Sequence, residues 1–186
     1  MEHYLVKDLM VPISEYAVVV VGTPLIKAIR VLEKAQEEYT ISKYQHRSIL
    51  VLDENGHIVG KISQLRALKA LEPEFEFNDN IAELRKFKFS ETYIAQLQDK
   101  YRSQKKFITH SALQEAANKK VEEFMQAPSP GEYVAEDCSL DAAILQLTAD
   151  QQHLSLLVTR DKQIVGVLRI ADVFAAVFHE MMTLKP

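Results

Sequence analysis

Hydrophobic and polar positions follow one pattern twice along this chain. Residues 57–68 read HIVGKISQLRAL and residues 163–174 read QIVGVLRIADVF, with Ile-Val-Gly in the same register in both. Each stretch begins with the compact apolar run of a buried strand and continues with apolar positions at helical spacing. The pattern predicts, at both places, a strand that leads directly into a helix.

A second helix and a second strand precede each of these stretches. Apolar residues three and four positions apart predict helices in TPLIKAIRVL, from Thr23, and in SLDAAILQL, from Ser139. We expect Thr23 and Ser139 to cap them, with Pro24 in the first turn of the earlier helix. Strand pairs follow in SILVLDENGHIVGKIS and LSLLVTRDKQIVGVLR, and Asn55-Gly56 predicts a tight hairpin turn in the first pair.

The two halves therefore share an order of strand, helix, strand, strand and helix. They also begin alike, with VKDLMVP at residues 6–12 and VEEFMQAP at residues 121–128. A single unit of this kind leaves one apolar face uncovered, and its copy covers that face by pseudo-twofold packing. We predict an α+β fold made of two such repeats, with repeat 1 at residues 1–71 and repeat 2 at residues 120–186.

Residues 72–119 between the repeats predict a helical insertion. We expect Ser90 to cap one helix, and Ser111 with Gln114 to form the capping box of another. Between Arg85 and Lys106 the insertion carries seven Lys or Arg against two acidic residues. We interpret this positive excess as a solvated helix face, and a docking surface for an acidic partner or for nucleic acid is the alternative.

Composition and charge fit a soluble globular protein. Of the 186 residues, 47% are hydrophobic and 26% are charged. A net charge of −4 argues against a general nucleic-acid or anionic-membrane binder, because such binding needs an excess of Lys and Arg. No stretch is long enough to span a bilayer, and the first residues lack the apolar core of a secretory signal, so we expect a cytoplasmic protein.

Catalytic and metal-binding motifs are missing from the sequence. The single cysteine, Cys138, permits no intramolecular disulfide and no zinc cage built from cysteines. The six histidines show no spacing that places two of them on one helix face, and five glycines leave no room for a glycine-rich phosphate loop. We therefore expect no catalytic residues, no metal and no enzymatic activity.

The paired motifs resemble a tandem pair of CBS domains, also called a Bateman module. The resemblance covers most of the chain outside residues 72–119 and depends on both leading segments, both capped helices and both strand–helix stretches. It implies a free-standing regulatory module of two β-α-β-β-α units with clefts between them. It also implies a regulatory ligand, for which AMP, ADP, ATP and S-adenosylmethionine are the candidates, and often a homodimer.

In that family, a Ser or Thr three residues after the strand glycine and an Asp three residues later hold the phosphate and ribose of the ligand. Here Ser63 follows Gly60 and Arg66 stands in place of the carboxylate, whereas Arg169 follows Gly166 and Asp172 keeps the carboxylate. The resemblance thus gives Asp172, Arg169, Ser63 and Arg66 as candidate nucleotide-binding residues, and neither repeat has the complete motif.

Alternative interpretations remain open. Asp172 either holds a ribose or only charges the first turn of the last helix, and the two arginines either bind a ligand or pair with acids. The last helix, IADVFAAVFHEMM, is apolar enough to pack against a second protomer, and core packing within one chain would use the same residues. The alternative function is an interaction or assembly module with degenerate nucleotide sites, whose partner protein binds through the helical insertion.

Overall fold

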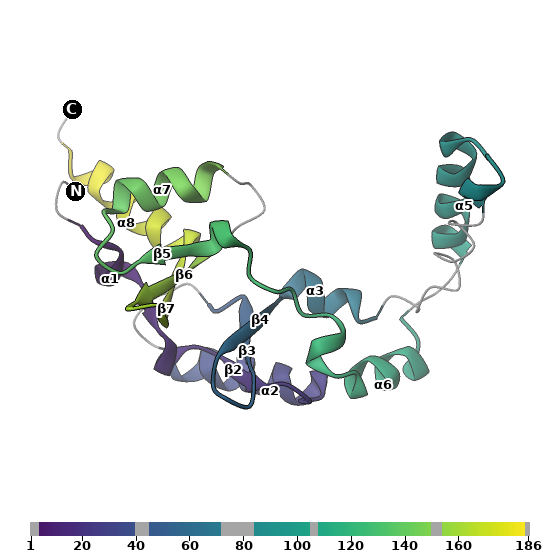
Figure 1. Ribbon diagram of the computed structural model, residues 1–186, viewed down its shortest axis with the longest axis horizontal. Helices are drawn as coiled ribbons and strands as arrows, with labels where there is room; N and C mark the ends of the chain where they lie inside the picture. The colour runs from purple at the N-terminus through teal and green to yellow at the C-terminus, as the bar shows by residue number, and fades with distance from the viewer. Residues whose placement is uncertain (1–3, 40–44, 72–83, 105–107, 150–153, 185–186) are drawn as a thin grey trace.

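The computed structural model describes residues 4–39, 45–71, 84–104, 108–149 and 154–184. Both repeats have the predicted order of elements (Figure 1). The first consists of β2 (Val18–Val20), α2 (Leu25–Glu38), β3 (Ser48–Leu52), β4 (Ile58–Ser63) and α3 (Gln64–Lys69). The second consists of β5 (Tyr133–Ala135), α7 (Leu140–Ala149), β6 (Ser155–Arg160), β7 (Gln163–Arg169) and α8 (Ile170–Thr183).

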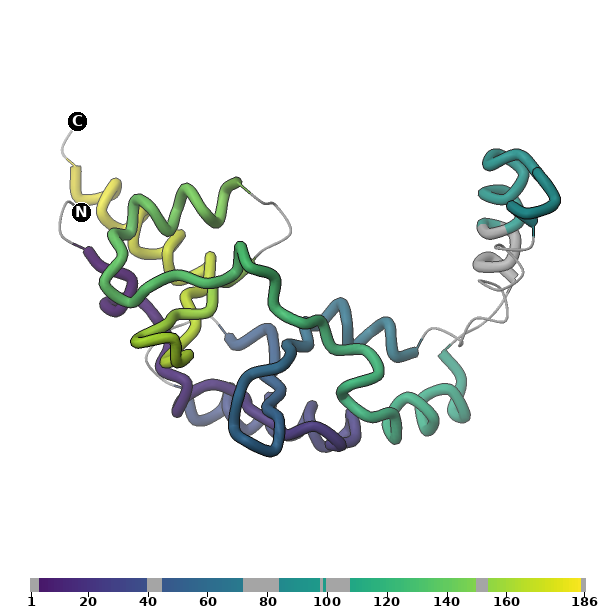
Figure 2. Tube along the Cα trace, in the orientation of Figure 1, coloured from purple at the N-terminus to yellow at the C-terminus, as the bar shows by residue number. Residues whose placement is uncertain are grey.

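Short elements lead into each repeat, and helices lie in the insertion. Before the first repeat come α1 (Val6–Leu9), β1 (Val11–Pro12) and the 3-10 turn η1 (Ile13–Glu15). Before the second come the 3-10 turns η2 (Val121–Glu123) and η3 (Pro130–Glu132). The insertion contains α5 (Glu91–Gln104) and α6 (His110–Asn118), and α5 stands well away from both repeats in the trace (Figure 2).

Each repeat adds its leading segment to the sheet of the other repeat. The first repeat forms the sheet β2-β3-β4, and the second forms β1-β7-β6-β5, so β1 from the start of the chain pairs with the second repeat. Val11 lies opposite Val167 and Pro12 opposite Gly166 in an antiparallel ladder. In return, Gln126 exchanges two backbone hydrogen bonds of 2.9 Å with Lys61 on β4. The pseudo-twofold relation therefore includes reciprocal strand exchange.

Hydrophobic packing explains why α2 and α7 form where the periodicity predicts them. Ala28 of α2 is fully buried against the β2-β3-β4 sheet, and Ala143 of α7 is fully buried against the other sheet. Besides the hydrophobic core of each repeat, a separate buried cluster packs between the two sheets. Its buried members are Val11, Tyr16, Leu50, Leu157 and Val167.

Local turn and cap chemistry confirms some predictions and corrects others. The β3–β4 turn has Gly56 at φ 82°, as the Asn-Gly signal predicts, and the Ser139 hydroxyl accepts a 3.3 Å bond from the Ala142 N–H. The cap predicted at Thr23 is wrong. The Thr23 hydroxyl donates a hydrogen bond back to the Val20 carbonyl at 2.7 Å, and Pro24 occupies the N-cap position of α2.

In the insertion, one predicted helix cap is confirmed and one is corrected. Ser90 caps α5 as predicted, since its hydroxyl accepts a 3.2 Å bond from the N–H of Tyr93. The capping box predicted at Ser111 is wrong, because the N-cap of α6 lies two residues earlier. Thr109 is its N-cap and accepts from Ala112 N–H at 3.2 Å.

Candidate functional site

Ser63 and Arg66 meet at the start of α3. The Ser63 hydroxyl accepts a 3.2 Å hydrogen bond from the backbone N–H of Arg66, so this serine is the N-cap of the helix. The Arg66 side chain is half-buried. The structure thus brings these two predicted residues together through a cap, in which the serine hydroxyl already accepts one bond.

A cross-repeat ion pair lies on the neighbouring strand. The Lys61 ammonium on β4 pairs with the carboxylate of Glu132, which ends η3 of the second repeat. The Glu132 side chain is fully buried and that of Lys61 is 13% exposed. Such a pair leaves a buried charge behind if either partner is lost, so it fixes how η3 sits against the first sheet.

Arg169 and Asp172, expected to contact separate parts of a ligand, are joined to each other. Arg169 Nη2 donates to Asp172 Oδ1 at 2.6 Å, and Arg169 Nε donates to the other carboxylate oxygen. Both side chains are nearly buried, at 6% and 11% exposure. This fork-to-fork geometry is the strongest form of an arginine–carboxylate pair.

His46, from the start of the strand pair in the first repeat, completes the surroundings of Arg169. It is fully buried, and its Nδ1 lies 3.3 Å from Arg169 Nη1. Because a guanidinium only donates, Nδ1 must accept, which requires a neutral imidazole. Burial, and then the nearby Arg169 charge, lowers the pKa of His46. Its Nε2 has no hydrogen-bond partner among the described residues.

Two tyrosines enclose this group. The Arg169 guanidinium carbon lies 5.2 Å from the centre of the Tyr39 ring, within cation–π range. The His46 ring lies 4.6 Å from that of Tyr39 and 4.8 Å from that of Tyr16. Burial raises the pKa of both tyrosines, and the Tyr16 hydroxyl shares a 2.7 Å bond with Ser48. We call Tyr16, Tyr39, His46, Arg169 and Asp172 the Arg169 cluster.

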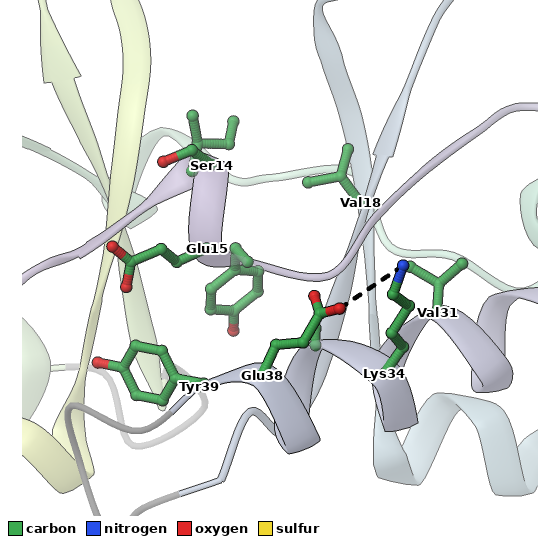
Figure 3. A pocket seen from close by; sticks show the side chains of 10 residues that line it. Ser14, Glu15, Val18, Val31, Lys34, Glu38 and Tyr39 are labelled. Carbon is green, nitrogen blue, oxygen red and sulfur yellow. Dashed lines mark ion pairs between the residues drawn. The ribbon is translucent and has the colours of Figure 1, made fainter.

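A cavity of about 530 Å³ adjoins the Arg169 cluster. It lies between η1, β2 and α2 (Figure 3). Tyr16 and Tyr39 line this cavity and are also members of the Arg169 cluster. Figure 3 also shows Glu15 and Tyr39 at one side of the cavity and the Lys34–Glu38 ion pair at the other. The arrangement places polar groups at both ends of an otherwise largely apolar wall.

Sequence reasoning missed the cross-repeat partners of the candidate residues. His46 is 123 positions away from Arg169, and Glu132 is 71 positions away from Lys61, so no local spacing connects them. One signal was available for Glu132. The segments SEY at 14–16 and GEY at 131–133 occupy the same place in the two repeats, and in each the glutamate ends a 3-10 turn.

The comparisons with known proteins agree with this geometry. Residues 6–73 and residues 121–179 each match the family model of the CBS domain. The chain belongs to the CBS-domain family. CBS-pair proteins are typically regulatory, non-catalytic modules. Among proteins of curated function, none matches this chain.

Solved CBS-pair structures share the fold over almost the whole chain. CBSX2 in complex with AMP is 21% identical, with a TM-score of 0.57 over 96% of this chain and 99% of that one. CBSX2 from Arabidopsis thaliana is 20% identical, with a TM-score of 0.58 over 97% and 99%. A CBS domain-containing protein of unknown function from Bacillus anthracis is 18% identical, with a TM-score of 0.61 over 96% of both chains. These likenesses establish a CBS-pair fold.

Two further searches of the described residues give negative results. No helix there combines the length and the apolar character that crossing a bilayer requires. Nor do three or more His, Cys, Asp or Glu side chains in that part of the chain gather as a metal site would need.

Proposed function

We propose that this CBS pair is a regulatory sensor that binds an adenine nucleotide or adenosyl compound at the Arg169 cluster. The observation that carries the proposal is the buried Arg169–Asp172 pair beside a fully buried histidine. Strongly polar groups gathered where two repeats meet are typical of a ligand site. The AMP complex of CBSX2, a CBS-pair protein of the same fold, supports the choice of ligand class.

Binding in this proposal exchanges one set of partners for another. Asp172 accepts from the two ribose hydroxyls, and the Arg169 guanidinium turns to the phosphate or carboxylate of the ligand. A ligand that offers both hydroxyls and an anion compensates both halves of the ion pair that it opens. A ligand lacking either one leaves a buried charge uncompensated, which is unfavourable.

The same exchange supplies a sensing mechanism. Arg169 and Asp172 belong to the second repeat, whereas Tyr16, Tyr39 and His46 belong to the first. A ligand that moves Arg169 away from Asp172 also changes its contacts with Tyr39 and His46, and with them the packing between repeats. It shifts the arrangement of the repeats only as far as it binds one arrangement better than the other.

Thermal unfolding tests the proposal. The purified protein is heated with AMP, ADP, ATP or S-adenosylmethionine in millimolar excess. A ligand at about a hundred times its Kd raises the free energy of unfolding by about 2.7 kcal/mol, a Tm shift of several degrees. The shift should vanish in Asp172→Asn and persist in Asp141→Asn, which changes an acid in the first turn of α7. No shift with any ligand would count against nucleotide sensing.

The second candidate function is an assembly module whose partner binds the helical insertion. Aromatic side chains exposed on the insertion favour it: Phe87 is 74% exposed, and Phe89, at 46%, stacks on Tyr93 with ring centres 5.4 Å apart. Lys86 and Lys88 lie among them and are exposed. This surface suits an acidic partner protein, and it becomes the leading candidate if no nucleotide binds.

We also propose a homodimer that packs through α8. Val173 points into the core of its own repeat and is 5% exposed. Phe174 and Phe178 lie on the other side of the helix, 53% and 45% exposed, with ring centres 4.2 Å apart. Met181 extends the same exposed face at 55%. An apolar surface of this kind suits a second copy of the helix in isologous contact.

A further inference from the structure

A tight turn in the insertion joins a short helical segment to α5. The Phe89 N–H donates to the Leu84 carbonyl at 3.1 Å, and the Lys88 N–H donates to the Arg85 carbonyl at 3.0 Å. Lys88 itself has a left-handed backbone, with φ 60°. These two bonds and the left-handed residue make a Schellman motif, which ends a helix in one defined conformation.

A cap and an ion pair fix the same turn from the side of α5. Ser90 is the cap, through its 3.2 Å bond from the N–H of Tyr93. Arg85 Nε and Nη2 each donate at 3.1 Å to one carboxylate oxygen of Glu91, so a forked ion pair spans the turn. A partner therefore meets a surface that is already ordered, which reduces the entropy lost on binding.

Exposed aromatic rings lie on this ordered turn. Phe87 is 74% exposed, Phe89 46% and Tyr93 45%. The rings of Phe89 and Tyr93 stack, with their planes 22° apart. Aromatic side chains are enriched in protein interfaces and supply much of their binding energy. We call Lys86, Phe87, Lys88, Phe89 and Tyr93 the insertion tip.

The insertion tip carries a local positive charge although the whole chain is acidic. Lys86 and Lys88 are exposed. Arg85 and Glu91 neutralise each other in their ion pair, so the two lysines determine the net charge around the turn. The positive end of the dipole of the 14-residue helix α5 lies at the same place. The complement of this surface is an acidic partner.

Two features favour a protein over a nucleic-acid strand. The Glu91 side chain is 71% exposed, and its carboxylate would lie close to the phosphates of a strand. Phe89 and Tyr93 each cover part of the other ring, which leaves less open ring face for a base to stack on. The same rings lie one helical turn apart, which suits apolar side chains spaced by one turn on a partner helix.

We propose that the insertion tip binds an acidic amphipathic helix of a partner protein. Two apolar residues of that helix, one turn apart, pack on the rings, and flanking carboxylates pair with Lys86 and Lys88. The proposal rests on the second candidate function and deepens it by naming the kind of segment that the insertion recognises. Because α5 stands well away from both repeats, this helix and a nucleotide at the Arg169 cluster can bind together (Figure 2).

Selection from a displayed library of random peptides on the full-length protein tests the proposal. We expect the enriched sequences to carry a net negative charge and apolar residues three or four positions apart. The best of them, synthesised with a fluorophore, should bind at least tenfold more weakly to Phe89→Ser and to Lys86→Glu by fluorescence anisotropy. AMP in millimolar excess should leave its affinity unchanged.

Matched controls separate the insertion tip from the rest of the surface. Leu113→Ser changes an apolar residue of α6 that is 45% exposed, close to the exposure of Phe89, and Lys69→Glu reverses an exposed charge on α3. Both should bind the peptide like the wild type. Equal weakening by Lys86→Glu and Lys69→Glu would overturn the proposal, because it would indicate general attraction of an acidic peptide to any lysine.

The remaining outcomes distinguish this proposal from the function on which it rests. Enriched peptides that are neutral or basic, yet protect α5 or α6 from hydrogen exchange, would overturn the acidic helix and keep the insertion as an interface. Peptides that protect neither helix and bind Phe89→Ser like the wild type would overturn both. Binding of single-stranded oligo(dT) that Phe89→Ser weakens tenfold, with no acidic peptide enriched, would assign the insertion tip to nucleic acid instead.

Discussion

The Met10 side chain lies directly over Gly166, in the place where any other residue would put its Cβ. A Cβ built on Gly166 would lie 2.8 Å from Met10 Sδ and 2.7 Å from the Val11 carbonyl oxygen. The pseudo-symmetric pair is Met125 over Gly60, where a Cβ would lie 2.9 Å from Met125 Cγ. In each repeat, the strand glycine thus leaves room for a methionine from the leading segment of the other repeat.

Substitution of these glycines should therefore destabilise the fold unequally. Gly166→Ala should lower the free energy of unfolding by about 1–3 kcal/mol, because the new methyl group meets backbone that cannot move aside. Gly60→Ala should cost less, since it meets only the flexible Met125 side chain. Urea unfolding measures both. Gly131→Ala is the control, as nothing lies within 4 Å of its Cβ position. A larger loss for Gly60→Ala would contradict the packing described.

Loss of one partner from the Arg169–Asp172 pair should lower the free energy of unfolding substantially. Asp172→Ala leaves a nearly buried guanidinium uncompensated, and we expect a loss of about 3 kcal/mol in the free energy of unfolding. The double variant Arg169→Leu with Asp172→Leu should recover part of that loss, because no unpaired charge remains. The exposed Arg160–Glu136 pair provides the comparison, and Arg160→Ala should have a much smaller effect. Equal losses at the two pairs would refute this account.

Acidification should weaken the protein through His46. A histidine in the unfolded chain titrates near pH 6.5, whereas burial lowers the pKa of His46 in the folded state. As the pH falls below about 6.5 the unfolded state binds more protons, so the free energy of unfolding decreases until the pH passes the folded pKa. Above about pH 6.5 the contribution of the neutral His46 imidazole to the free energy of unfolding is complete.

Chemical denaturation between pH 5 and 8 measures this dependence. His46→Gln should flatten the slope below pH 6.5, because no imidazole remains there to be protonated. An identical slope in wild type and His46→Gln would show that other groups dominate the acid response.

Charge on the exposed face of α8 should abolish the proposed homodimer. Phe178→Glu places a carboxylate in the centre of that apolar face and should give a monomer in sedimentation velocity. Leu145→Glu, which changes a 70% exposed residue of α7, should leave the dimer intact. A monomeric wild-type protein, or a Phe178→Glu variant that still dimerises, would remove α8 from consideration as the interface.

The sequence predicted the repeats well because their signals are local. The helical spacing around Ala28 and Ala143 and the Asn-Gly turn depend on residues close together in the chain. The cap at Thr23 was mispredicted for a local reason too, since its hydroxyl had a competing acceptor in the Val20 carbonyl.

The candidate site was only half predictable. Motif spacing located Arg169 and Asp172, but their pairing depends on side-chain geometry, and the positions of His46 and Tyr39 depend on how the repeats pack. Strand exchange was also beyond local reasoning, because the short strand at Val11 finds its partner more than 150 positions later. The boundaries at residues 71/72 and 119/120 stay a prediction.

Reciprocal strand exchange also bears on how the chain comes apart. The first repeat completes its sheet edge with Gln126, and the second completes its own with Val11 and Pro12. Neither half is whole without the other, so the two should melt in one cooperative transition. A single proteolytic cut within the insertion should then leave two fragments that remain associated, each holding a strand that the other needs.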